Sequence, residues 1–537
     1  MAVIGLGPTG TSFVWKLIDE LRADQPGVPL RLTAIDPGDE LGAGYAFQAT
    51  HRLNMRASSL HMDPLAPTGF TDWLRAHCDT DDRDDRDDRD DRDDRDDRDD
   101  LEYPTRRLFG RYLRTVLAEA VASAESAGVT VEHWRTSAAE LDRSGESFRI
   151  TGADGATRSF DVVVMATGES RHGALGHWTG RPNFVASLAE THQLGRIPAD
   201  ARVGIVGSSL SAVDICIQLL GQGHRGPITC HARTRGFPKV QGATSRPQPA
   251  LLDPDWLSWS TGAGRRRIRL RTVARALAQG LDARAEEPYT PGMPDPREWF
   301  SRDGRRHRSR QDESQVFQAA VTAAVESRTT WYQALDSLSP HTPAIWNALD
   351  ERDQLLFLTT WRARWSEYRH SMPLVNARAL LPAVSSGQLT VRTGLTSVTP
   401  ESSGATTRWR VNSRSGPPGS AYDVLVDATG GQLAIACRRD PLLRTAIHRG
   451  LLSPDPRGGL RVLFGTCQVL AADNRPCPNL YLVGPMTFGT HFYTNSFETN
   501  RDNAFRVAHA VRTTLIRTRR RPVTPTGAAL TQTIGGR

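Results

Sequence analysis

The most restrictive feature of the sequence is a glycine-rich turn directly after its first apolar run. Residues 2–10 read AVIGLGPTG, in which Gly5, Gly7 and Gly10 have the spacing G-x-G-x-x-G. An apolar stripe with helical spacing follows over residues 13–21. The glycines permit a tight turn and let backbone N–H groups approach a pyrophosphate at the positive end of a helix. The pattern predicts a dinucleotide site, with a plain strand–turn–helix as the alternative.

The next apolar run supports the dinucleotide interpretation. Residues 30–35 have the composition of a buried strand, and Asp36 follows them directly. At the end of the second strand of such a unit, a carboxylate can accept hydrogen bonds from a ribose. We therefore expect Asp36 to contact the bound dinucleotide.

The same order of elements recurs in the middle of the chain. Residues 202–206 form an apolar run, and Gly207, Ser208 and Ser209 begin the turn that follows it. The next apolar run, residues 228–231, leads to Arg233 and Arg235 rather than to a carboxylate. Because a guanidinium suits the 2′-phosphate of a dinucleotide, the second site is predicted to prefer NADPH over NADH. A degenerate second site that binds nothing is the alternative.

Two further segments match each other. Residues 161–168 read DVVVMATG and residues 423–430 read DVLVDATG, so that each apolar strand ends in Ala-Thr-Gly. Such a small-residue turn allows a chain crossover to pass close to a bound dinucleotide. Thr167 and Gly168 of the first copy are therefore candidate binding residues.

These signals together predict an α/β fold with two Rossmann-like dinucleotide-binding domains and a mainly helical insertion. We expect the first domain to comprise residues 1–170 and 380–521 and the second to comprise residues 171–379, with the insertion at 245–370. Residues 79–100 consist mostly of a DDR repeat with no apolar side chain to bury, and we expect a disordered loop there. A disordered tail is expected at 522–537.

Composition excludes several classes of protein. The six cysteines contain no C-x-x-C pair, which disfavours a disulfide scaffold and a dithiol oxidoreductase. No apolar run approaches the roughly 20 residues of a membrane span, and no basic region precedes the first apolar run as in a signal peptide. The net charge is +7, but the arginine clusters lack a nucleic-acid reading motif. We expect a cytoplasmic protein that binds neither membrane nor nucleic acid and has no metal site.

The two glycine turns and the paired Ala-Thr-Gly strands resemble the class B flavin-dependent monooxygenases, which have two dinucleotide-binding domains. The resemblance is closest to the amino-acid N-hydroxylases of the ornithine, lysine and aspartate type, and residues 42–45, 51–55, 365–370 and 480–485 are also similar to that family. The sequence departs from the family at Pro485, where an acidic residue is usual, and it lacks the F-x-G-x-x-x-H motif of many S- and N-oxygenating and Baeyer–Villiger relatives.

The resemblance implies FAD in the first domain and NADPH in the second, with dioxygen and a small molecule as reactants. Asn54 and Met55 would lie near the isoalloxazine, and the C-terminal segment around Gly484 and Pro485 would close over the flavin. The implied FAD contacts are Gly5, Gly7, Pro8, Thr9, Gly10, Asp36, Asn54, Met55, Thr167, Gly168, Gly484 and Pro485. The implied NADPH contacts are Gly207, Ser208, Ser209, Arg233 and Arg235.

The implied reaction is hydroxylation of a small amino acid or amine at nitrogen through a flavin hydroperoxide. An acidic substrate such as aspartate is favoured, because an arginine of the insertion (Arg267, Arg362, Arg364 or Arg369) can clamp a carboxylate. His491 and Asn495 are the candidate catalytic hydrogen-bond partners. The alternatives are an NAD(P)H oxidoreductase without oxygen transfer, an S-oxygenating or Baeyer–Villiger monooxygenase, and a non-catalytic redox sensor.

Overall fold

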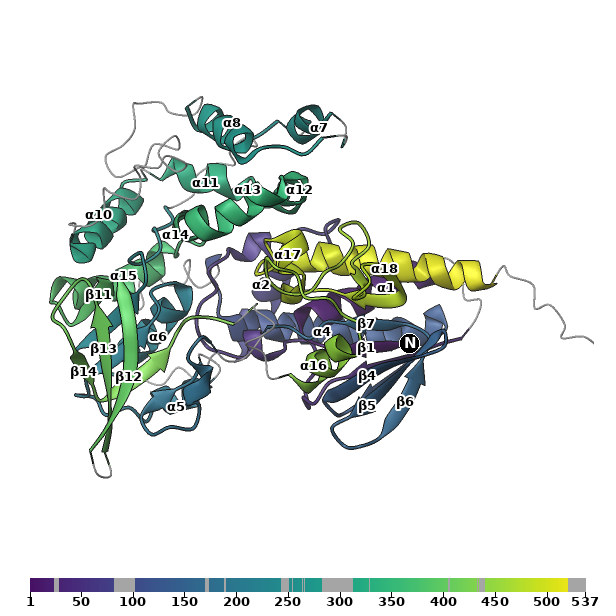
Figure 1. Ribbon diagram of the computed structural model, residues 1–537, viewed down its shortest axis with the longest axis horizontal. Helices are drawn as coiled ribbons and strands as arrows, with labels where there is room; N and C mark the ends of the chain where they lie inside the picture. Colours follow the sequence, from purple (N-terminus) through teal and green to yellow (C-terminus); the bar gives the residue numbers. More distant parts are fainter. Residues whose placement is uncertain are drawn as a thin grey trace, which may run out of the picture.

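The structure contains two α/β domains, each built on a mainly parallel β-sheet, and a separate group of helices (Figure 1). The computed structural model describes residues 1–23, 29–81, 102–169, 173–187, 190–242, 251–282 except 254, 263 and 265, 312–403 except 328, 406–433 except 432, and 440–519. Most of the DDR repeat and the whole predicted C-terminal tail lie outside these residues.

The first domain is built on a six-stranded sheet in the order β16-β17-β7-β1-β2-β3. All neighbouring pairs are parallel except β16 and β17 at one edge. The strands are β1 (Ala2–Ile4), β2 (Leu30–Ile35), β3 (Val129–Trp134), β7 (Val163–Met165), β16 (Gln468–Leu470) and β17 (Pro476–Leu482). The helices α1 (Pro8–Ala23), α4 (Arg106–Ala124) and α18 (Phe497–Arg519) pack together, and their apolar faces share one core with the sheet.

The second domain is built on a five-stranded parallel sheet in the order β11-β10-β9-β15-β8. The strands are β8 (Phe184–Val185), β9 (Val203–Val206), β10 (Ile228–Ala232), β11 (Leu389–Thr393) and β15 (Val424–Asp427). The helices α6 (Leu210–Gly221), α10 (Glu313–Val325) and α15 (Leu374–Ser385) pack against it in one core. The predicted fold class and each strand predicted around a glycine turn or an Ala-Thr-Gly motif are confirmed.

The predicted domain boundary at residue 380 is wrong. The strand β11 pairs with β10, and β15 lies between β9 and β8, so the second domain continues to Asp427. The physical reason is that Val424 and Val426 are buried in the core of the second sheet. The two Ala-Thr-Gly motifs therefore belong to different domains, one to each sheet.

Two antiparallel sheets, which the sequence patterns did not predict, extend the two domains. One consists of β4 (Ala138–Ser144), β5 (Ser147–Gly152) and β6 (Thr157–Phe160). The other consists of β12 (Leu395–Ser403), β13 (Thr406–Ser413) and β14 (Ser420–Tyr422). Further helices are α2 (Gly69–Asp81), α5 (Thr191–Leu194), α16 (Pro441–His448) and α17 (Phe488–His491).

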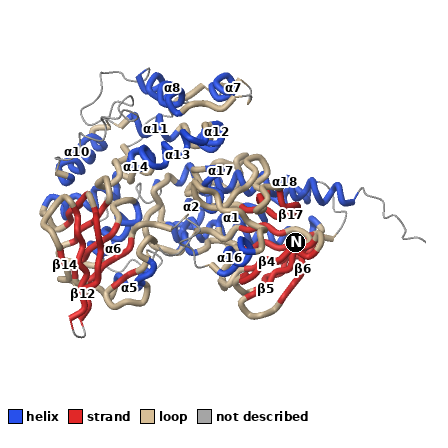
Figure 2. The backbone as a smooth tube through the Cα atoms, viewed as in Figure 1, coloured by secondary structure: helices blue, strands red, loops and turns tan. Residues whose placement is uncertain are grey.

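The predicted insertion is helical, and no strand occurs among its described residues, as the blue and red tube in Figure 2 shows. Its helices are α7 (Trp256–Thr261), α8 (Leu270–Asp282), α10, α11 (Thr330–Asp336), α12 (Thr342–Ala348), α13 (Glu351–Leu356), a π-helical turn (Phe357–Trp361) and α14 (Arg362–Arg369). We call the group without α10 the helical body. Its apolar core includes Phe488, Phe492 and Tyr493 from the C-terminal segment.

An ion pair between described residues connects a helix of the first domain to a helix of the second. Arg106 at the start of α4 donates from Nη2 to Asp214 Oδ2 on α6 at 3.1 Å. The aspartate side chain is 1% exposed, whereas the arginine side chain is 22% exposed. Burial raises the pKa of Asp214, and the positive charge of Arg106 opposes that shift.

None of the described helices is both long enough and apolar enough to cross a membrane.

Candidate functional site

The carboxyl ends of the parallel strands of the first sheet bring together segments that are far apart in the sequence. Gly5 follows β1 with φ +90°, and a Cβ there would lie 2.5 Å from the Ala166 carbonyl oxygen after β7. A Cβ on Gly10 would lie 2.2 Å from the carbonyl oxygen of Gly5. These two glycines are therefore required by the protein's own turn, whatever it binds.

Gly7 has a different environment from the other two glycines. A Cβ on Gly7 would meet its nearest protein atom, the Cα of Gly44, at 3.4 Å, which is ordinary van der Waals contact. The protein therefore leaves room beside Gly7 at the start of α1. An open glycine at the N-terminus of a helix is the arrangement that lets a pyrophosphate approach the backbone. Pro8 and Thr9 begin the same helix.

Asp36 lies at the end of β2, as predicted. Its Oδ2 accepts a hydrogen bond from the backbone N–H of Leu6 at 2.8 Å, and its Oδ1 accepts one from Gly38 at 2.8 Å. These bonds hold the carboxylate beside the glycine turn. A carboxylate has about four lone-pair sites, so Asp36 can still accept hydrogen bonds from a ribose.

The remaining FAD candidates lie on three segments near this sheet edge. Gly168 follows β7 with φ +68°, and the hydroxyl oxygen of Thr167 is buried without a hydrogen-bond partner among the described residues. A Cβ on Gly484, after β17, would lie 3.5 Å from Thr9 Oγ1. The Pro485 carbonyl accepts a hydrogen bond from the Thr494 hydroxyl at 3.1 Å, and this bond connects the turn after β17 to the segment that follows α17.

The second glycine turn is tied to both neighbouring strands. Gly207 has φ +128°, and a Cβ there would lie 2.5 Å from the Ala428 carbonyl oxygen, beside the second Ala-Thr-Gly motif. The Ser208 hydroxyl donates to the carbonyl oxygens of Arg235 at 2.9 Å and Gly236 at 3.0 Å. Ser209 precedes α6 and makes no side-chain capping bond. The N–H groups of Ala212 and Val213 donate to the Ser209 carbonyl oxygen, so the first two N–H groups of α6 are the ones that another acceptor could use.

The two arginines after β10 differ in their surroundings. Arg235 Nη1 donates to the buried carboxylate of Glu367 at 2.8 Å, so this arginine is bound to the helical body. Arg233 is exposed, and the described residues include no ion-pair partner for it. Burial, with the positive charge of Arg233 adding to it, lowers the pKa of Arg362 on α14. The two positive charges therefore repel each other, and a bound anion would relieve that repulsion.

The candidate catalytic residues lie in unlike environments and do not contact each other. His491 is fully buried, with Nε2 3.2 Å from the Phe464 carbonyl oxygen, and burial lowers its pKa to about 4. The exposed Asn495 donates from Nδ2 to Nε2 of His370 at 3.1 Å. Burial, with the nearby Arg369 and Arg362, lowers the pKa of His370 to about 3. Both imidazoles are therefore neutral at pH 7.

The four arginines of the insertion also differ. Arg369 is 8% exposed, pairs with Asp336 at 3.2 Å, and lies 4.7 Å from the ring centre of Tyr493. Arg267 donates to the backbone carbonyl of Asn347. Arg364 is half-buried and has contacts of its own. Arg362 is exposed over part of its side chain, but its guanidinium lies 4.9 Å from the ring centre of Phe488, and this packing removes water from the charged group.

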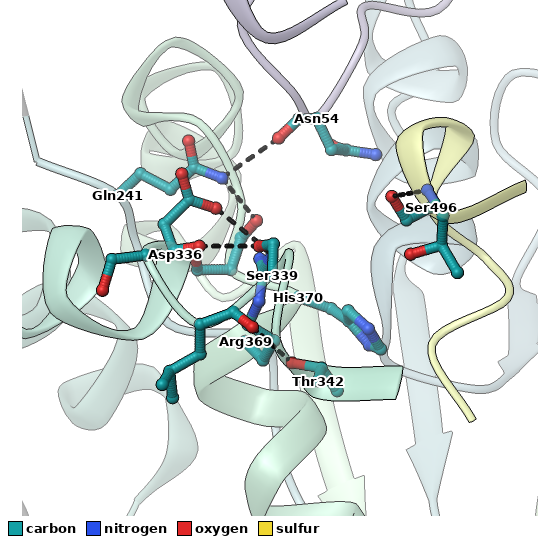
Figure 3. Close-up of polar contacts among 12 residues, drawn as sticks. Asn54, Gln241, Asp336, Ser339, Thr342, Arg369, His370 and Ser496 are labelled. Atoms are coloured by element: carbon teal, nitrogen blue, oxygen red, sulfur yellow. Dashed lines mark hydrogen bonds and ion pairs between the residues drawn. The ribbon is translucent and has the colours of Figure 1, made fainter. Parts of the chain in front are cut away.

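A polar network around Asn54 was not found from the sequence. Gln241, from the end of the loop after β10, donates to the backbone oxygens of Asn54 and Ser371 (Figure 3). No sequence motif marks this glutamine, because the groups it contacts belong to segments far away in the chain. The residue preceding it, Val240, forms a bridge with Met372, and that pairing is visible only in three dimensions.

Comparison with known proteins agrees with this arrangement. Residues 2–170 match the FAD-NAD(P)-binding family. No curated protein sequence matches the chain. The L-lysine 6-monooxygenase of Pseudomonas syringae is similar in structure, with a TM-score of 0.58 and 15% identity over 95% of this chain and 98% of that one.

Two further solved structures share the fold. The ornithine N-hydroxylase of Kutzneria sp. 744 has a TM-score of 0.53 and 15% identity over 96% of this chain and 99% of that one. The desferrioxamine-pathway cadaverine monooxygenase of Erwinia amylovora has a TM-score of 0.50 and 11% identity over 100% of this chain and 98% of that one. The chain thus has the two-domain fold of the flavin N-hydroxylases over nearly its whole length.

Proposed function

We propose that the protein is an FAD- and NADPH-dependent monooxygenase that hydroxylates the nitrogen of a small amino acid or amine. The observation that carries the proposal is the pair of glycine turns after β1 and β9, the first with an open Gly7 and the second with the exposed Arg233 after the next strand, β10. The shared fold with lysine, ornithine and cadaverine monooxygenases supports the same reaction class.

Each part of the chain has a role in this proposal. The Gly7 turn would hold the FAD pyrophosphate, Asp36 a ribose, and Arg233 the 2′-phosphate of NADPH. When bound and reduced, FAD supplies the activation of dioxygen. The apolar contacts between the helical body and the C-terminal segment exclude water from their interface. His370 and His491, neutral at pH 7, can act as hydrogen-bonding groups without adding charge.

The test is to incubate the purified protein with FAD, NADPH, oxygen and a panel of amino acids and amines. We expect substrate-dependent NADPH oxidation together with a hydroxylamine or a more oxidised nitrogen product, identified by mass spectrometry. NADPH oxidation that yields only hydrogen peroxide with every substrate would instead identify an oxidoreductase without oxygen transfer. Oxygenation of a thioether or ketone alone would place the reaction among the S-oxygenating or Baeyer–Villiger enzymes.

Replacing Arg233 with alanine is expected to remove most of the preference for NADPH over NADH. A charge-assisted bond to the 2′-phosphate contributes about 1.5–3 kcal/mol, which corresponds to roughly one to two decades in the ratio of the two Kd values. The measurement is flavin-reduction kinetics with both cofactors. Arg235→Ala is the matched comparison and should change the ratio less, because that side chain is bound to Glu367.

An acidic amino acid such as aspartate is the preferred substrate in our proposal, with Arg362 as its carboxylate clamp. Of the four arginines of the insertion, Arg362 is exposed and has no ion-pair partner among the described residues. Arg362→Ala should therefore raise KM for an acidic substrate by roughly ten- to hundredfold, as loss of a charged hydrogen bond does. The NADPH-to-NADH ratio should change far less than in Arg233→Ala. An unchanged KM would assign the carboxylate to another group.

A further inference from the structure

Gln241 lies where three segments of the chain meet. Its side chain is almost fully buried, with the residue 3% exposed. Its backbone N–H donates to the Met372 carbonyl oxygen at 2.8 Å, so that the segment leaving the second sheet toward the helical body lies beside the segment that returns from the helical body. The loop containing Asn54, from the first domain, is the third segment (Figure 3).

The side-chain amide of Gln241 uses both N–H donors on backbone carbonyls. Nε2 is 3.1 Å from the Asn54 oxygen and 2.9 Å from the Ser371 oxygen, and Oε1 accepts from the Tyr103 hydroxyl at 3.0 Å. Backbone carbonyls only accept, so the amide nitrogen must point to them and the amide cannot be flipped. The contacts therefore define one orientation of the side chain.

The third contact is itself fixed by the first domain. Tyr103 is buried, and its hydroxyl accepts a hydrogen bond from Arg56 Nε at 3.1 Å. Arg56 Nε also lies 2.7 Å from a carboxylate oxygen of Glu102. The amide oxygen of Gln241 is thus bound to a network that contains Tyr103 and the Arg56–Glu102 ion pair, and its amide nitrogen binds the backbone at Asn54.

We propose that Gln241 is a positioning residue that sets the backbone at Asn54 relative to the second domain. The inference rests on the proposed function and on the expectation from the family resemblance that Asn54 and Met55 lie near the flavin. The Asn54 side chain points away from Gln241, toward the segment with Ser496 (Figure 3). Its Oδ1 is buried and has no hydrogen-bond partner among the described residues. Since no such partner fixes that oxygen, its direction depends on the backbone that Gln241 holds.

The test compares Gln241→Glu with wild-type protein loaded with FAD. The glutamate has the same size but replaces two donors with an acceptor that faces two carbonyl oxygens. Gln241→Met, which has no charge, is the second variant in case the glutamate prevents folding. The matched control is Gln388→Met, because Gln388 also donates to two backbone oxygens, those of His224 at 2.7 Å and Gly226 at 3.5 Å, within the second domain.

Two readouts decide the proposal. Amide hydrogen exchange over residues 49–60 should become about tenfold faster in the Gln241 variants, both with and without FAD, as expected for loss of one to two net hydrogen bonds. The amount of hydroxylated product per NADPH oxidised should fall about tenfold, with FAD content unchanged. The Gln388 variant should match wild type in both readouts.

Exchange and product ratio at wild-type values in both Gln241 variants would overturn the proposal. The same would follow if the Gln388 control showed equal changes, because the effect would then be general. A wild-type protein that makes no hydroxylated product would contradict the proposed function, whereas the exchange comparison would still decide whether Gln241 positions the Asn54 segment.

Discussion

Replacing Gly7 with alanine is expected to give a folded protein that is purified without FAD. The added methyl meets only ordinary contact with Gly44, so the polypeptide itself can accommodate it. The methyl would occupy the space through which a pyrophosphate reaches the helix N-terminus. Overpacking of this kind costs about 1–3 kcal/mol, or roughly ten- to hundredfold in the Kd for FAD. The measurement is the flavin absorbance per protein, followed by titration with FAD.

Two other glycines define what the Gly7 result means. Gly221→Ala is the control, because a Cβ at this helix end has no protein atom within 4 Å, and its flavin content should equal that of wild type. Gly10→Ala should fail at an earlier stage, since its methyl would lie 2.2 Å from the carbonyl of Gly5 and disturb folding. If the purified Gly7→Ala protein contained FAD and bound it with wild-type affinity, the prediction that this turn binds the FAD pyrophosphate would be wrong.

Arg106→Leu is expected to destabilise the protein by about 3–5 kcal/mol at pH 8, because it leaves Asp214 buried without its counterion. The control is Arg225→Leu, which breaks an ion pair whose side chains are 70% and 75% exposed. Exposed pairs contribute about 0–1 kcal/mol. Chemical denaturation of both variants measures the difference, and equal losses would show that the buried pair does not stabilise the domain arrangement.

The stability lost in Arg106→Leu should depend on pH in a defined direction. Burial already raises the pKa of Asp214 in the folded protein, so the folded state binds this proton more tightly than the unfolded state. The resulting stabilisation is complete below the unfolded pKa of about 4 and is lost as pH rises through the folded pKa. Removing Arg106 raises the folded pKa further. The difference in Tm between Arg106→Leu and wild type should therefore shrink between pH 8 and pH 5.

The sequence predicted those parts of the fold whose signals are local. A short apolar run followed by a glycine turn marks β1 and β9, because only glycine tolerates the left-handed backbone and close carbonyl contact seen at Gly5 and Gly207. The domain boundary was missed because β11 and β15 return to the second sheet from a distant part of the chain. Strand pairing across such a distance depends on tertiary packing and has no local pattern.

The candidate site divides in the same way. The places of Asp36 and Arg233 at strand ends could be predicted, because each follows a recognisable strand, whereas their binding roles stay predictions. The sequence did not distinguish Arg233 from Arg235, since the difference arises from Glu367 on the helical body. The Asp214–Arg106 pair and the Gln241 contacts also join separate domains or segments. Such contacts depend on how helices and strands pack against each other, and the hydrophobic pattern of a single segment carries no information about that packing.

The packing of the helical body also has a consequence for biosynthesis. The Trp346 indole donates to the Gly489 carbonyl oxygen at 3.0 Å and stacks on Phe492 at 4.6 Å between ring centres. A ribosome adds residues from the N-terminus, and domains generally fold as units during synthesis. The core around Trp346 stays incomplete until Phe492 has left the exit tunnel. Until then Trp346 lacks the ring of Phe492 and the Gly489 carbonyl as partners, so the helical body completes its core only late in synthesis.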